Sequence, residues 1–149
     1  MTDGVKSEMG EIQIVVEASI RPEIADHVIG GLVNFNNRQA APSNHTDLAV
    51  SAQSGDDIIG GLLGYTNWGW LFIAQLWVAE SARGGGVGRR IVEAAEAEAR
   101  RRGCKHAHVD TLSFQALPFY QRLGYIVFGQ LDDYPEGHTR YFLQRRSIA

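Results

Sequence analysis

The sequence predicts a mixed α/β fold in which one sheet carries helices on both faces. Short β-branched segments alternate with segments of helical periodicity in the order β-α-β-β-β-α-β-α-β-β, and mixed order of this kind is typical of a sheet with helices packed on it. The chain has 149 residues, of which 44% are hydrophobic and 21% charged, so it can bury one core. We expect a single domain over residues 1–149 with a flexible start at residues 1–10.

The elements of the first half are predicted by their apolar pattern and by the turns that bound them. β-Branched or alternating runs indicate strands, proline suits a first helical turn, and a short glycine turn joins antiparallel strands. The long apolar run that ends at Val78 predicts a central strand buried on both faces. In order, we expect a strand at residues 12–17, a helix from Pro22 to about Phe35, strands at 48–53 and 57–66, and a strand at 70–78.

The second half predicts two helices and three strands. Glutamate and arginine four residues apart support a helix at residues 87–102, and Gly103 is suited to end it. The remaining elements are a strand at 106–111, a helix at 115–123, and strands at 125–131 and 139–144 around a loop at 132–138.

The composition argues against nucleic acid and membranes as partners. The formal net charge is −3, whereas both of those partners attract basic surfaces. No apolar run is long enough to span a bilayer, and the start of the chain lacks a signal-peptide pattern. The single cysteine, Cys104, excludes an internal disulfide and is expected to be a small buried hydrophobe. We therefore expect a cytoplasmic protein.

A glycine loop, residues 83–88, lies between the strand at 70–78 and the following helix. The first amides of a helix lack an intrahelical acceptor, and together with the helix dipole they form an anion site. Glycine permits the sharp turn and lets a phosphate approach the backbone. Arg83, Arg89 and Arg90 favour this hypothesis, because a bound pyrophosphate would offset their repulsion by the dipole. The alternative is a structural turn with solvated arginines.

Two segments resemble signatures of the GNAT N-acetyltransferase superfamily. The Walker pattern lacks its Lys and Ser/Thr here, and the dinucleotide fingerprint lacks its third glycine because position 91 is Ile91. Residues 76–88 are instead similar to the acetyl-CoA signature Arg/Gln-x-x-Gly-x-Gly/Ala, which is met at Arg83, Gly86 and Gly88. Residues 116–125, Ala-Leu-Pro-Phe-Tyr-Gln-Arg-Leu-Gly-Tyr, are similar to the superfamily's Ala-x-x-Phe-Tyr-x-x-Leu-Gly-Phe segment.

The resemblance implies a mostly antiparallel central sheet in which two parallel strands splay apart. It also implies acetyl-CoA, without a metal, as the ligand. The pantetheine arm would enter the gap between the splayed strands, and a backbone N–H near Val78 would polarise the thioester. The implied acetyl-CoA-binding residues are Leu76, Trp77, Val78, Arg83, Gly84, Gly85, Gly86, Val87, Gly88, Arg89, Ser113 and Tyr120.

The implied reaction is attack of a neutral amine on the thioester, which needs a base for the amine and an acid for the departing thiolate. Tyr120 matches the superfamily's tyrosine acid, and a phenol stays protonated at neutral pH; the alternative is a packing residue. Ser113 stands where many members carry Asn; its hydroxyl could bond to the pantetheine, and Ser113 is a candidate catalytic residue together with Tyr120 and His138. Gln75 stands where many members carry a strand glutamate. Since an amide cannot take a proton, the base is unassigned.

The loop at residues 132–138 joins the last two strands, which in the superfamily flank the acceptor pocket. It holds three carboxylates, a tyrosine and a histidine. His138 titrates near neutrality and is a candidate base. Asp133 and Tyr134, with His138, are candidate acceptor-binding residues, because carboxylates attract a cationic amine. The alternative is an ordinary polar hairpin loop.

Two further groups of polar residues have competing interpretations. Asn34 and Asn37 end the first helix, where they are candidate acceptor-binding residues or a helix cap. His106, His108 and Asp110 share one face of a predicted strand at a spacing that could hold a metal. No other ligand group accompanies them, so an ordinary strand face is the better interpretation.

The sequence as a whole predicts an N-acetyltransferase that acts on a primary amine of a small molecule or peptide. The alternative is a non-catalytic acyl-CoA-binding or sensor module, which the missing strand carboxylate favours and Tyr120 opposes. A homodimer is expected from the superfamily alone.

Overall fold

The computed structural model describes residues 10–149, and the chain divides into two compact units, residues 1–41 and 42–149. The described part of the first unit holds one helix, α1 (Pro22–Gln39), with Pro22 in its first turn and Arg38 in its last. This order agrees with the preference of proline for helix starts and of cations for helix ends. The predicted flexible start lies outside the described residues, apart from Gly10.

The strand predicted at residues 12–17 is wrong, because residues 10–21 form no helix or strand. A β-branched segment becomes a strand only when a neighbouring strand pairs with its backbone. Helix α1 itself continues past Phe35 and ends at Gln39, where the Ala40 N–H donates to the Asn36 carbonyl.

The second unit is built on a six-stranded sheet of order β1-β2-β3-β4-β6-β5. The β3–β4 pair is parallel, and every other neighbouring pair is antiparallel. Its strands are β1 (Thr46–Ser54), β2 (Asp57–Asn67), β3 (Trp70–Val78), β4 (His106–Leu112), β5 (Ile126–Asp132) and β6 (Thr139–Arg145), and its helices are the 3-10 turn η1 (Glu80–Ala82), α2 (Val87–Arg101) and α3 (Leu117–Arg122). The predicted mixed α/β class with a largely antiparallel sheet and one parallel pair is confirmed.

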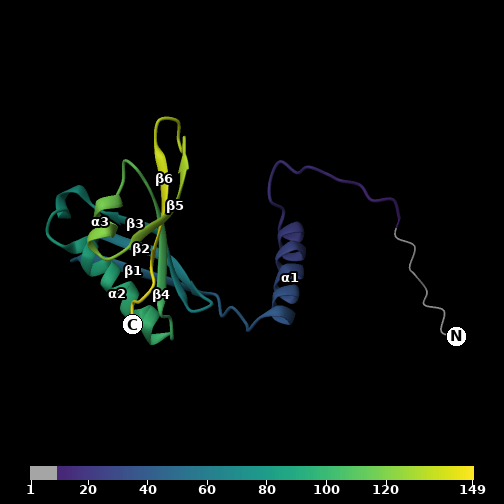
Figure 1. Ribbon diagram of the computed structural model, residues 1–149, viewed down its shortest axis with the longest axis horizontal. Coiled ribbons are helices and arrows are strands. Elements are labelled where there is room, and N and C mark those ends of the chain that lie inside the picture. Colours follow the sequence, from purple (N-terminus) through teal and green to yellow (C-terminus); the bar gives the residue numbers. More distant parts are fainter. Residues whose placement is uncertain (1–9) are drawn as a thin grey trace. The chain divides into compact units, whose positions relative to one another are not determined.

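Within this unit, α2 and α3 pack on the same face of the sheet (Figure 1). Alternate strand residues such as Leu71, Val109 and Leu143 point into the core, where they meet Val92 and Ala95 of α2. The prediction that residues 70–78 are buried on both faces is wrong. Burial in β3 alternates instead, because the strand carries helices of this unit on one side only.

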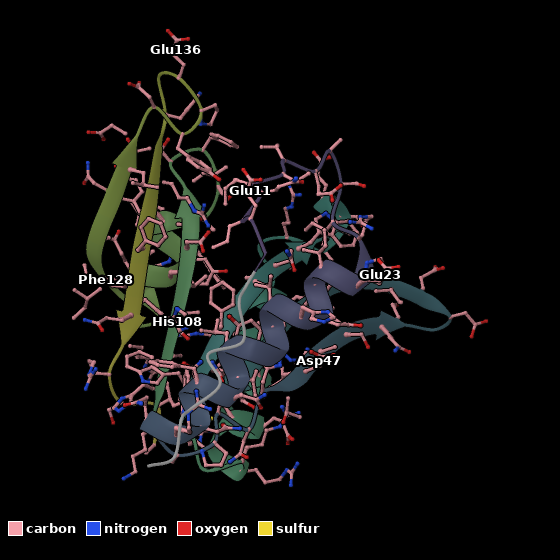
Figure 2. The ribbon with its side chains drawn as sticks, turned by 90° about the vertical axis from the view of Figure 1, so that its right-hand side faces the viewer. Glu11, Glu23, Asp47, His108, Phe128 and Glu136 are labelled. Carbon is pink, nitrogen blue, oxygen red and sulfur yellow. The ribbon has the colours of Figure 1, made fainter. Side chains whose placement is uncertain are left out.

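The opposite face of the sheet carries His106, His108 and Asp110 on β4, and we call it the histidine face. These residues alternate with the buried Ala107, Val109 and Thr111, so they must point away from α2. Figure 2 looks onto this side of the sheet and labels His108 on β4.

The sheet splits between β3 and β4. Pairing of the two strands runs from Trp70↔His106 to Ile73↔Val109 and then stops, although both strands continue. On the other side of β3, a register shift opposite Gly64 marks a bulge. A Cβ at Gly64 would lie 2.0 Å from the carbonyl oxygen of Phe72, so only glycine permits this close approach.

A buried carboxylate joins α2 to the rest of the sheet. Glu96, 2% exposed, accepts a hydrogen bond from the Tyr125 hydroxyl at 3.1 Å and an ion pair from Arg145 Nη1 at 2.7 Å. Burial, and then the charge of Glu96, raises the pKa of Tyr125, so the phenol stays protonated. We call these three side chains the Glu96 clamp.

Among the described residues, no helix combines the length and hydropathy that a membrane crossing requires.

Candidate functional site

The glycine loop has the backbone that an anion site requires. Gly84 and Gly86 have φ of +82° and +81°, a left-handed conformation that glycine adopts readily. Gly86 is the N-cap of α2, and the first helical bond runs from the Arg90 N–H to its carbonyl at 3.1 Å. The first-turn amides that precede Arg90 therefore lack a helical acceptor. No acidic residue lies in this turn, so nothing there repels an anion.

Arg83 ties the loop to the end of β3. Its Nε donates a hydrogen bond to the carbonyl oxygen of Val78 at 3.0 Å. Arg89 lies in the first turn of α2, is largely exposed and pairs loosely with Glu93 at 3.5 Å. Two of the three arginines that the sequence singled out thus lie at the loop, Arg83 bonded to the backbone of β3 and Arg89 largely exposed to water.

A cavity of about 590 Å³ opens beside the loop, between the end of β3, the start of α2 and α3. It is lined by Leu76, Trp77, Val78, Ala82, Arg83, Gly84, Gly86, Val87, Gly88, Arg89, Ala116, Phe119, Arg122 and Leu123. Of the candidate acetyl-CoA-binding residues, only Gly85, Ser113 and Tyr120 are not part of this lining.

Sequence reasoning missed five of the lining residues, Ala82, Ala116, Phe119, Arg122 and Leu123, and Phe119 is the one with an aromatic ring. A Cβ at Gly88 would lie 3.3 Å from the Phe119 ring, so the first turn of α2 and α3 are in close contact here. The adjacent Phe119-Tyr120 pair was the available signal, but helix phase decides which ring faces the cavity, and neither the motif nor the spacing reveals it.

Tyr120 lies in the core behind Phe119. It is 4% exposed, and its ring packs edge-on against Phe119 and Tyr125 at centroid distances of 5.1 and 5.7 Å. Burial, with a smaller contribution from the charge of Asp110, raises the pKa of Tyr120. The phenol therefore stays protonated at neutral pH.

The structure brings Ser113 and His138 together. Ser113 Oγ lies 3.3 Å from His138 Nδ1 and accepts a hydrogen bond from the Thr139 N–H at 3.1 Å. The His138 ring also meets Phe114 edge-on at 4.8 Å. These contacts join the loop after β4 to the start of β6.

The hairpin loop at residues 132–138 carries the other candidate acceptor residues. Asp133 Oδ1 accepts a weak hydrogen bond from the Gly137 N–H at 3.5 Å. The Tyr134 hydroxyl accepts one from Arg140 Nη1 at 3.0 Å. Glu136 marks the outer tip of this hairpin (Figure 2).

An ion pair crosses from β4 to β6 on the histidine face. Arg140 donates from Nε and Nη2 to Asp110 Oδ1 at 3.0 and 2.9 Å. Its guanidinium also lies over the rings of Tyr134 and Phe142, at 4.8 and 5.1 Å from their centroids. Asp110 is thus linked through Arg140 to the hairpin loop.

The histidines of β4 form part of an aromatic ladder. The His106 ring lies 4.7 Å from Trp70 and the His108 ring 4.7 Å from Phe72, while Nδ1 of His106 bonds to the Arg146 carbonyl. Among the described residues, no three histidine, cysteine or acidic side chains are grouped so as to hold a metal. The strand-face interpretation accounts for both rings.

Two other groups of candidates are not part of the cavity lining. Asn34 and Asn37 lie in the C-terminal half of α1, in the first unit, and their part in an acceptor site stays a prediction. Cys104 is 5% exposed, and burial raises the pKa of its thiol. The expectation of a small buried hydrophobe is confirmed.

The fold and the site have counterparts among known proteins. Residues 17–125 match the model of the acetyltransferase (GNAT) family. The chain is 36% identical over 116 residues to an acetyltransferase of Agrobacterium fabrum, covering 77% of this chain and 85% of that protein. It is 46% identical over 88 residues to blasticidin-S acetyltransferase of Streptomyces morookaense, covering 58% of this chain and 65% of that protein, just under two thirds of its length.

Solved structures agree with this match. A candidate acetyltransferase from Agrobacterium tumefaciens superposes with a TM-score of 0.84 at 32% identity, covering 91% of this chain and 99% of that one. An aminoglycoside 6'-N-acetyltransferase complexed with coenzyme A superposes with a TM-score of 0.62 at 20% identity, covering 87% and 93%, and shows the same fold. The family match and these relatives agree with the split sheet, the glycine loop and the adjoining cavity. The chain therefore belongs to the GNAT acetyltransferase family and is an acyltransferase.

Proposed function

We propose that the chain transfers an acetyl group from acetyl-CoA to a primary amine of a small molecule. The observation that carries this proposal is the cavity that joins the glycine loop to the end of β3, which pairs with β2 but has no β4 partner. A small-molecule acceptor is supported by the similarity to a blasticidin-S acetyltransferase. A peptide amine is the alternative acceptor that the test below includes.

The residues of the cavity fit coenzyme A in their donor chemistry. The amides around residues 84–89 offer N–H donors at a helix start, which suits a pyrophosphate. Arg83 and Arg89 supply positive charge beside those donors. Leu76, Trp77 and Val78 lie on the stretch of β3 that has no β4 partner, so backbone groups on that side, other than the Val78 carbonyl that Arg83 engages, are available to the amides of a pantetheine arm.

Within this proposal, a backbone N–H of the β3 stretch from Ala74 to Val78, which has no β4 partner, donates to the thioester oxygen and stabilises the negative charge that develops there. Tyr120 is proposed to supply the proton that the departing thiolate needs, because it matches the superfamily's tyrosine acid and a phenol is protonated at neutral pH. Ser113 and His138 hold the start of β6 against the end of β4. Together with Asp133 and Tyr134 they are proposed to border the acceptor.

The test is release of free thiol from acetyl-CoA in the presence of a panel of amines that includes small cationic molecules and a peptide N-terminus. We expect consumption of acetyl-CoA with a small-molecule amine. Binding of acetyl-CoA without consumption by any amine would instead support a sensor module. A homodimer, which light scattering would measure, and a cytoplasmic location stay predictions.

Replacing the proposed acid tests the mechanism. In Tyr120→Phe, kcat should fall about 10-fold or more, because the thiolate loses its proton donor, while the Kd for acetyl-CoA measured by titration calorimetry should not change. Tyr141→Phe, which also removes a hydroxyl from a ring packed against the core, is the matched control. Equal kcat in both variants would contradict the acid role of Tyr120.

A further inference from the structure

His108 lies where the two parallel strands separate. It is paired with Phe72, one position before the last β3–β4 pair, Ile73↔Val109. The cavity-lining segment Leu76–Val78 follows farther along β3. The stretch of β3 without a β4 partner begins at Ala74, two residues beyond Phe72, so an acyl group bound at the start of this stretch lies close to His108, whose side chain points away from α2.

We propose that His108 is the general base that removes a proton from the acceptor ammonium. The proposal rests on the proposed function, since it names the base for that same reaction. Gln75 of β3 cannot fill this role because its side chain takes no proton. The histidine face then receives the acceptor, and the cavity on the other side of the sheet receives the acetyl donor.

The His108 ring is held by aromatic neighbours and keeps its nitrogens free. Its centroid lies 4.7 Å from that of Phe72 and 5.7 Å from that of Trp70. Over the described part of the chain, no hydrogen bond engages either of its ring nitrogens. In contrast, Nδ1 of His106 bonds to the Arg146 carbonyl, and Nδ1 of His138 faces Ser113. His108 can therefore accept a proton without breaking an existing contact.

The surroundings of His108 keep its imidazole neutral. Burial lowers its pKa, and Asp110 opposes this shift with a smaller effect. The negative charge of Asp110 is itself balanced by Arg140. The groups around the ring are His106 and Asp110 on β4, the uncharged Trp70 and Phe72 on β3, and Gln144 with the nearby Arg140 on β6, while Arg146 lies over Trp70. A neutral imidazole at neutral pH is the state that a base requires.

The chemical step balances with these residues. His108 takes one proton from the ammonium, and the freed nitrogen lone pair forms a C–N bond to the thioester carbonyl carbon. The C–S bond then breaks, and the sulfur takes a proton from Tyr120. The attacking nitrogen loses its second proton, which restores the Tyr120 phenol, and His108 releases its proton to water. One amide, one thiol and one proton result.

The experiment compares His108→Gln with His106→Gln, a control on the same strand face and in the same aromatic ladder. With an amine that the wild type acetylates, kcat of His108→Gln should fall about 100-fold or more. The Kd for acetyl-CoA should stay within about twofold, because no cofactor contact is removed. Plotted against pH, the wild-type kcat should fall on the acid side below the ordinary histidine pKa of about 6.5. This acid limb should be absent in His108→Gln and retained in His106→Gln.

Each outcome decides the matter. Unchanged kcat in a folded His108→Gln chain, or an equal loss in His106→Gln, overturns the assignment and leaves the acetyltransferase proposal intact. A wild type that acetylates no amine overturns both. If His108→Gln does not fold, as judged by circular dichroism, the wild-type profile decides: an acid limb supports the base and a flat profile overturns it.

Discussion

The two faces of the sheet in the second unit present different kinds of atoms to a ligand. On the side of α2, the glycine loop offers backbone amides, and its conformation depends on residues that have no side chain, Gly84 and Gly86. On the histidine face, the polar groups are side chains: His108 within an aromatic ladder, and Asp110 in an ion pair with Arg140. A binding site made of backbone amides is disrupted when a side chain is added at one of its glycines. A site made of side chains is disrupted when one of those side chains is truncated. With the donor assigned to the glycine loop and the acceptor to the histidine face, as proposed above, the loop should tolerate little variation in its glycines, and the histidine face should change substrate by exchanging side chains.

The largest expected effect is a loss of folding stability when the Glu96 clamp, which holds α2, is removed. Glu96→Ala would leave the buried Tyr125 hydroxyl without its acceptor and Arg145 without its ion-pair partner, and the free energy of unfolding should fall by about 3 kcal/mol. Denaturant unfolding measures this loss. Glu93→Ala is the control, because Glu93 makes only an exposed pair with Arg89, which contributes at most about 1 kcal/mol. Equal losses in the two variants would mean that the Glu96 clamp does not hold α2.

The next effect tests the backbone site by adding a charge. Gly86→Asp should weaken acetyl-CoA binding about 100-fold, because it places a carboxylate beside the proposed pyrophosphate site. Gly86 also has a left-handed backbone conformation, which glycine adopts most readily. No protein atom lies within 4 Å of a Cβ there, so repulsion of the ligand, rather than a clash within the protein, is the cause. Gly86→Asn is the matched control, since Asn has the same shape and also tolerates this conformation. Calorimetry measures the Kd for acetyl-CoA of both variants. If both bind as tightly as the wild type, the pyrophosphate does not bind at this loop.

The smallest effect should come from a side chain on the donor side. Arg89→Ala should weaken acetyl-CoA binding only about threefold, because the guanidinium is exposed and its attraction is screened by water and salt. The loss should shrink as salt is raised, which calorimetry at two ionic strengths would show. A loss as large as that of Gly86→Asp would make the donor site dependent on side chains and would erase the contrast between the two faces.

Much of the donor side was predictable from sequence because its determinants are local. Glycines followed by a helical repeat fix both the loop and the start of α2, and the apolar run gave the bounds of β3 as the structure has them. The strand at residues 12–17 failed because strand formation needs a partner that no local pattern supplies.

The histidine face depends on contacts between distant residues, which a single sequence does not reveal. β6 is inserted between β4 and β5, and only this order brings Arg140 to Asp110. The spacing of His106, His108 and Asp110 correctly predicts a shared face. It does not show that the His106 ring is held by a carbonyl while the His108 ring remains free.

The Glu96 clamp also bears on how the protein receives its ligand. A helix held near its middle by a buried carboxylate cannot rotate about its axis without separating that group from Arg145 and Tyr125. The orientation of the amides at the start of α2 is therefore established when the chain folds, before any anion arrives. The conformational entropy that a mobile loop would lose upon association is already lost, so affinity at this end reflects contacts rather than ordering.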